Sequence, residues 1–307
     1  MAEETEAAAA TLGAGASGKT WRRRDRGATA GLLSGPLLWL ILFFVAPVLF
    51  IAAYSVGAVG IFPTDAGVVS LEAWRRFLGG GVYMSLFWKS IRMSLTVSIA
   101  VVLLAYPVGY FLALGVRKRK YVLLLLIIAP FLTSYLLRVL AWKVILGDAG
   151  VLNSFLSWSH VRGPDEPITW LLYSQFAVML VLAYVWVPFV ALPIFVSLDN
   201  MDRSYLEAAG DLGAGRLRTF VRVTLPLSLP GVVAAFLFVF IPTIGEFVTP
   251  LLVGGTSGYM YGNAIQDLFT RGTAWQTGSV LALFLLGVVA VLMALFGRFI
   301  QARSVTA

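Results

Sequence analysis

Residues 13–20 read GAGASGKT, which matches the phosphate-binding pattern G-x-x-x-x-G-K-[ST] letter for letter. In a nucleotide-binding domain such a loop joins a buried strand to a helix, so that aligned backbone N–H groups meet the phosphates. Here the preceding residues are acidic and alanine-rich and the following ones are basic, with no strand pattern before the loop. We therefore predict that the match is fortuitous and that residues 1–30 form a disordered tail.

Few other side chains could form a catalytic or metal centre. The chain has no cysteine, which excludes disulfides, thiolate metal sites and cysteine nucleophiles. Its one histidine, His160, stands in a polar stretch, SWSHVRGPDEP, whereas a metal site usually needs several clustered ligands. The apolar segments contain no paired acids and no nucleophile–base set, so the sequence predicts a non-catalytic protein with no metal site.

The composition is that of a membrane protein. Of the 307 residues, 59% are hydrophobic and 12% are charged, whereas soluble domains carry about 25% charged residues. Six apolar stretches each reach the ~20 residues that a helix needs to cross a bilayer. We therefore predict an all-α integral membrane fold with six transmembrane helices. The predicted spans are approximately residues 31–56, 90–115, 121–146, 169–198, 229–253 and 277–300.

The basic residues are distributed unequally between the connections. Fifteen of the 23 Lys and Arg residues stand in the N-terminal tail, the 116–120 loop, the 199–228 loop and the C-terminal segment. Because short cytoplasmic loops carry an excess of positive charge, we expect these four segments, and therefore both termini, to face the cytoplasm. The net charge of +8 then needs no nucleic-acid partner.

The connection 199–228 is patterned as two short helices rather than as a spacer. Ser204, followed three residues later by Glu207, forms a capping box that predicts the start of a helix. The glycines in 213–215 predict a turn, and Pro226 is expected to end the second helix at the membrane. A helical hairpin with small residues at its surface permits close approach of another protein, so the sequence predicts a docking element.

This connection resembles the EAA signature, E-A-A-x3-G-x9-I-x-L-P, of membrane subunits in binding-protein-dependent ABC importers. The departure from the pattern is Val223 in the isoleucine position, which is chemically minor. In that family the loop forms the coupling helix that fits a groove on a separate ATPase subunit. The matching residues, which the resemblance assigns to ATPase coupling, are Glu207, Ala208, Ala209, Gly213, Leu225 and Pro226.

The resemblance implies a type I importer permease fold in the bacterial cytoplasmic (inner) membrane, followed here over residues 31–307. It implies a non-catalytic subunit that carries no cofactor of its own, since ATP and Mg are bound by the partner ATPase. The implied partners are two ATPase subunits, a second permease subunit that is expected to be a different chain, and a substrate-binding protein.

Longer stretches resemble the spermidine/putrescine permeases of this superfamily. They are SLEAWRRFL, LLRVLAWKVIL, GVLNSFL, IPTIGEFVTPLLVGG and GNAIQDLF. The resemblance implies translocation of polyamines. Permeases for iron, thiamine or opines share much of this scaffold and remain alternatives. A stand-alone secondary carrier or channel is a further alternative, which the absence of a recognisable internal repeat disfavours.

Glu246 is the carboxylate predicted to lie inside a span, where a charge needs a partner or water. A polyamine could be that partner, with the aromatic residues Trp142, Tyr184 and Trp186 as walls for its ammonium groups. Arg138 is the other candidate, because its predicted depth in the third span equals that of Glu246 in the fifth. We therefore take Glu246, Arg138 and the three aromatic residues as candidate substrate-pathway residues and leave both alternatives open.

Overall fold

The computed structural model describes residues 31–60, 69–116, 118–160, 167–271 and 274–304. The tail 1–30, including GAGASGKT, lies outside the described residues. The chain divides into two units, residues 1–70 and 71–307, each of which is treated by itself. Among the described residues six helices are long and apolar enough to cross a membrane, and no strand is present, which confirms the predicted all-α fold with six spans.

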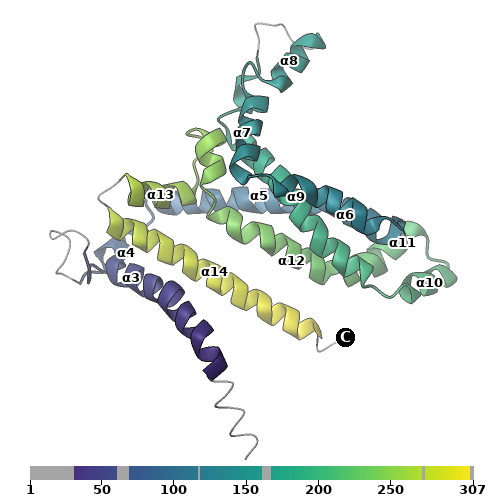
Figure 1. Ribbon diagram of the computed structural model, residues 1–307, viewed down its shortest axis with the longest axis horizontal. Coiled ribbons are helices and arrows are strands. Elements are labelled where there is room, and N and C mark those ends of the chain that lie inside the picture. The colour runs from purple at the N-terminus through teal and green to yellow at the C-terminus, as the bar shows by residue number, and fades with distance from the viewer. Residues whose placement is uncertain (1–30, 61–68, 117, 161–166, 272–273, 305–307) are drawn as a thin grey trace, which may run out of the picture. The chain divides into compact units, whose positions relative to one another are not determined.

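The first unit contributes one membrane helix, Gly31–Ser55, which includes the π-helical turn η1 (Ile41–Val45) and α3 (Ala46–Ser55). The second unit contains the remaining elements (Figure 1). They are α4 (Glu72–Leu78), α5 (Val82–Tyr110), η2 (Phe111–Gly115), α6 (Lys120–Ile128), η3 (Ala129–Leu132), α7 (Tyr135–Leu146), α8 (Val151–Trp158), η4 (Thr169–Leu171), α9 (Gln175–Asp199), α10 (Ser204–Asp211), α11 (Arg216–Thr219), η5 (Phe220–Thr224), α12 (Leu225–Ile244), η6 (Pro250–Gly254), α13 (Tyr261–Thr270) and α14 (Trp275–Ser304).

Helices α5, α9 and α12 pack against one another and form the centre of the second unit (Figure 1). Their contact faces carry valines with 0–1% exposure, among them Val101, Val181 and Val239. Two glycines allow the close approach. A Cβ on Gly109 of α5 would lie 2.9 Å from Ile194 of α9, and one on Gly231 of α12 would collide with Ser197 of α9.

The predicted third span, 121–146, is divided in the structure. Helix α6 ends in the 3₁₀ turn η3, which contains Pro130, and α7 begins at Tyr135. Proline at 130 cannot donate a backbone hydrogen bond to the preceding turn, and the backbone becomes extended at Thr133. The Thr133 hydroxyl donates to the Pro130 carbonyl at 2.6 Å and closes this turn. Because the residues on both sides of the break are apolar, hydropathy alone does not reveal it.

The predicted end of a helix at Pro226 is wrong. Helical backbone continues from Arg216 to Ile244 through α11, η5 and α12, with Pro226 and Pro230 inside it. The π-helical turn η5 widens the helix immediately before Pro226, which relieves the clash that a proline ring makes with the preceding turn. The second half of the 199–228 connection and the fifth membrane span therefore form one continuous helix.

Candidate functional site: the coupling loop and the break at Glu246

The coupling loop, residues 199–228, contains the two short helices that the sequence predicts, α10 and α11. Gly213 lies between them with φ +75°, a left-handed conformation that side chains other than glycine adopt at a cost. The helices turn back so that α10 contacts η5. The pattern therefore places its glycine where the backbone of the hairpin reverses.

The start of α10 differs from the predicted capping box. Ser204 is the first residue of the helix and its backbone N–H donates to the Asp202 carboxylate at 2.9 Å, while no side chain caps the helix at Arg203. This hydrogen bond lowers the pKa of Asp202 below its ordinary value. Asp202 takes the role that the sequence assigns to Ser204, because an aspartate two residues ahead of a backbone N–H closes a tight Asx turn.

The coupling loop exposes large apolar side chains among its charged residues. The side chains of Leu212 and Leu217 are 87% and 77% exposed, and Tyr205 is also exposed. Of the signature residues, Glu207 and Ala208 are exposed on α10, while Ala209 is buried. Exposed apolar groups beside small residues are typical of a protein–protein contact. Leu225 and Pro226 do not lie on this hairpin but on the first turn of α12.

Glu246 stands at a break just beyond the end of the fifth membrane-spanning helix, Arg216–Ile244. Helix α12 ends at Ile244, and helical backbone resumes at Val248 before the π-helical turn η6. The Glu246 Oε1 atom accepts the backbone N–H groups of Val248 at 2.9 Å and of Thr249 at 3.2 Å. A carboxylate at the start of a helix satisfies free N–H groups and is favoured by the helix dipole. Glu246 therefore caps the helical backbone that follows the break.

Helix α13 braces this break from the side. Asn263 donates from Nδ2 to the Phe247 carbonyl at 2.8 Å, while its Oδ1 accepts the backbone N–H of Met260. A Cβ on Gly262 would collide with the carbonyl oxygens of Gly245 and Glu246, lying 2.6 Å from the second. The missing side chain at Gly262 thus lets α13 lie against the irregular backbone, whose polar groups would otherwise need water.

Arg138, on α7, is buried without an ion pair to Glu246. Its residue exposure is 8%, its Nε has no hydrogen-bond partner, and its guanidinium lies 4.8 Å from the ring centroid of Phe131. Tyr135 stands within electrostatic range of both charges, and its hydroxyl shares a 2.5 Å hydrogen bond with Thr249. Ion pairs between described side chains are Arg76–Glu72, Lys120–Asp199 and Arg271–Asp267.

The three candidate aromatic residues fall into two groups. Trp142 and Tyr184 pack edge to face, with ring centroids 5.3 Å apart. Trp186 contacts Phe189 and Phe238, and its buried Nε1 has no partner. Phe189 in turn contacts Phe131, which links this second cluster to Arg138. The sequence analysis missed five contributors, which no letter pattern separates from other apolar positions: Phe131, Tyr135, Phe189, Phe238 and Thr249.

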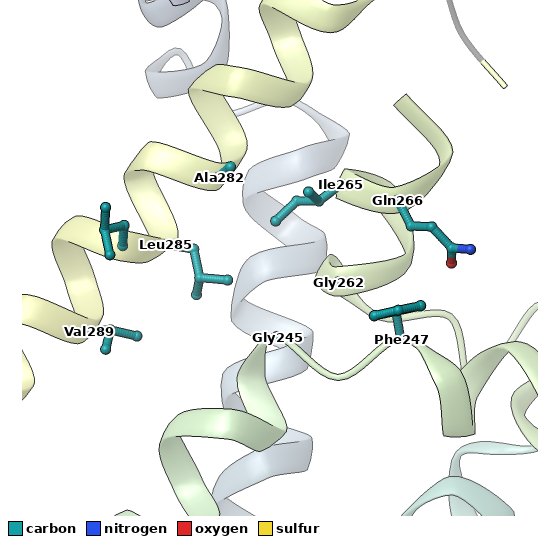
Figure 2. Close-up of a pocket in the computed structure, with 9 residues that line it drawn as sticks. Gly245, Phe247, Gly262, Ile265, Gln266, Ala282, Leu285 and Val289 are labelled. Carbon is teal, nitrogen blue, oxygen red and sulfur yellow. The ribbon is translucent and has the colours of Figure 1, made fainter. Parts of the chain in front are cut away.

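An open pocket of about 580 Å³ lies beside the break, between α13, α14 and the residues flanking Glu246 (Figure 2). Its walls are apolar except for Gln266. The lining side chains include Phe247, Ile265 and Leu285, and Glu246 itself is not among them. Such walls suit hydrocarbon rather than a charged solute, so this pocket does not extend the Glu246 site.

Comparison with known proteins identifies relatives over nearly the whole chain. A sequence model described as the binding-protein-dependent transport system inner membrane component matches residues 18–305. The spermidine/putrescine transport system permease protein PotB of Escherichia coli K12 is 34% identical over 264 residues, which cover 85% of this chain and 93% of PotB. PotB of Haemophilus influenzae is 33% identical over 85% of this chain and 90% of that protein.

A solved structure has the same fold. In the crystal structure of a bacterial ABC transporter that imports the acidic polysaccharide alginate, one chain aligns with a TM-score of 0.65. The alignment covers 93% of this chain and 99% of that chain at 17% sequence identity. At this identity the likeness concerns the arrangement of helices alone.

Proposed function

The chain belongs to the family of binding-protein-dependent transport system inner membrane components, and from this premise we propose that it is the permease subunit through which an ATP-driven importer moves polyamines. The observation that carries the proposal is the coupling loop, which combines the family's signature with an exposed apolar hairpin reversed at Gly213. The 33–34% identity to spermidine/putrescine permeases over 85% of the chain supports the substrate class.

The partners follow from the same features. Two ATPase subunits hydrolyse ATP, and one of them receives the coupling loop of this chain at the exposed surface around Leu212 and Leu217. A second permease subunit completes the pathway, and a substrate-binding protein delivers the solute from outside. Both termini and the coupling loop face the cytoplasm, which the concentration of Lys and Arg in these segments supports.

ATP dependence is the first test. The complete transporter, reconstituted in liposomes with its binding protein, is expected to accumulate radiolabelled spermidine when ATP is enclosed with the ATPase subunits. Iron, thiamine and opines added in excess should not compete. Uptake that needs an ion gradient but no ATP would instead establish a secondary carrier.

Gly213 tests the coupling loop. Valine is strained at φ +75°, whereas asparagine tolerates this conformation, so Gly213→Val should uncouple ATP hydrolysis from uptake while Gly213→Asn retains most activity. The measurement is spermidine taken up per ATP hydrolysed. Equal coupling ratios for both variants and the unmodified transporter would refute the assignment of this hairpin.

A substitution of Glu246 tests whether this residue belongs to the substrate pathway. In our proposal its Oε2 side faces the ammonium groups of the polyamine, while Oε1 holds the backbone of the break. Glutamine keeps an oxygen that can accept the same two N–H groups but carries no charge. Glu246→Gln is therefore expected to assemble normally and to raise the KM for spermidine uptake. Unchanged uptake kinetics would remove Glu246 from the pathway and leave it the capping role alone.

A further inference from the structure

The two ends of the coupling loop are attached to the two helices on either side of the α5–α6 connection. The loop begins at Asp199, the last residue of α9, and re-enters the membrane helix through η5. The α5–α6 connection comprises η2 and residues 116–119, which precede Lys120. An ion pair joins the first end of the loop to Lys120 at the start of α6, and aromatic contacts join the second end to the last turns of α5. No sequence motif predicts these contacts.

The first attachment is an ion pair between Lys120 and Asp199. The Lys120 ammonium lies 2.6 and 2.9 Å from the two carboxylate oxygens, and the side chains are only 21% and 19% exposed. It also lies 5.1 Å from the ring centroid of Tyr121. Partial burial protects a pair from the screening that makes exposed pairs weak. The other two ion pairs of described residues join positions i and i+4 of one helix, whereas this pair joins two helices.

The second attachment holds the far end of the loop to α5. Phe220, the first residue of η5, lies edge-on to both Tyr106 and Tyr110, with ring centroids 5.7 and 5.8 Å away. The Tyr106 hydroxyl shares a 2.9 Å hydrogen bond with Ser228, which is fully buried on α12. The returning arm of the loop therefore cannot shift along α5 without breaking these contacts.

Helix α6 leads from the ion pair towards the candidate pathway. Together with η3 it runs from Lys120 to the break at residues 133–134, beyond which α7 carries Arg138 and Trp142. A displacement of Asp199 that is carried into α6 by the ion pair would reach α7 through a short turn. Beside the pair, the ring of Tyr121 packs edge to face on Phe195 of α9, with centroids 6.3 Å apart.

We propose that the Lys120–Asp199 ion pair is a positioning contact that transmits movement of the coupling loop to α6 and so to α7. The inference rests on the proposed function, because it requires an ATPase that moves the loop. The pair touches neither nucleotide nor substrate. Its loss should separate ATP hydrolysis from transport rather than abolish either partner's binding.

The experiment compares Lys120→Gln with Lys118→Gln in the complete reconstituted transporter. Lys118 is an exposed lysine of the same turn, so its variant removes the same charge without removing the ion pair. Lys120→Gln is expected to raise the number of ATP molecules hydrolysed per spermidine imported several-fold. Lys118→Gln and the conservative Lys120→Arg should keep the ratio of the unmodified transporter.

Exchanging the two charges distinguishes a role in transmitting movement of the coupling loop from a purely structural role of the ion pair. Asp199→Lys alone should uncouple the transporter, and the double variant Lys120→Asp/Asp199→Lys should recover much of the coupling, since the pair is restored in reverse. An unmodified ratio in Lys120→Gln, or a double variant that assembles but remains as uncoupled as Asp199→Lys, overturns the proposal. If the unmodified transporter itself shows no ATP-driven uptake, the proposed function fails, and the proposed role of the ion pair fails with it.

Discussion

Charged side chains have different surroundings at the ends of the coupling loop and at the break beside Glu246. At the first end of the coupling loop, Lys120 of α6 and Asp199 of α9 form an ion pair that joins the two helices. At the break, Glu246 is held by its own backbone and Arg138 by aromatic rings, although Tyr135 interacts with both. A buried charge without an ion-pair partner costs free energy, and such a cost is retained most readily where the charge serves another purpose. The charges at the end of the coupling loop thus join two helices, whereas Glu246 at the break stabilises a local backbone conformation.

The largest effect is expected from a substitution of Gly262, where α13 packs against the break at Glu246. Gly262→Ala places a methyl group against two carbonyl oxygens, so α13 must move away, at a cost of about 1–3 kcal/mol or more. We expect a lower melting temperature and a smaller yield of monodisperse transporter in detergent. Gly287→Ala on α14 is the matched control, because nothing lies within 4 Å of its added Cβ. Equal melting temperatures for the two variants would show that α13 does not brace the break.

Arg138 should give a smaller effect, and one of opposite sign. Replacing an unpaired buried cation by a methionine of similar length removes the cost of its desolvation, so the stability of Arg138→Met should be unchanged or raised by about 1 kcal/mol, at the lower end of what such replacements give. The melting temperature of the purified transporter measures this. A marked fall would mean that Arg138 has a stabilising partner in the assembled complex. In that case the contrast between the two regions would be lost.

Much of the coupling loop could be predicted from the sequence because its determinants are local. A glycine between two helical patterns indicates a reversal, and the spacing from Glu207 to Pro226 is readable along twenty residues. The six spans were readable for the same reason, since hydropathy sums over neighbours. Predictions failed where two local rules competed, as at Pro226, where the π-helical turn η5 absorbs the proline.

The break at Glu246 could be predicted only in part, because its geometry depends on distant residues. The sequence indicated that Glu246 needs a partner, but its partners include backbone groups freed by an irregular turn that α13 stabilises. The aromatic cluster around Trp186 likewise draws on α9, α12 and η3. Phenylalanines at these positions look like ordinary lipid-facing or core residues until the helices are packed.

The smallest effect concerns the start of α10, where Asp202 replaces the predicted capping residue Ser204. Asp202→Ala should speed amide hydrogen exchange across residues 204–211, because a free N–H loses its acceptor, whereas Ser204→Ala keeps that backbone N–H and should have a smaller effect. The lowered pKa of Asp202 adds a pH dependence. The carboxylate stabilises the helix above its ordinary pKa of 3.8 and stops doing so as the pH falls through its lower, folded-state value. Protection that Asp202 supplies should therefore persist at neutral pH and disappear only in acid. Faster exchange in Ser204→Ala than in Asp202→Ala would restore the capping box, and the coupling loop would then be specified by its sequence down to the first hydrogen bond of α10.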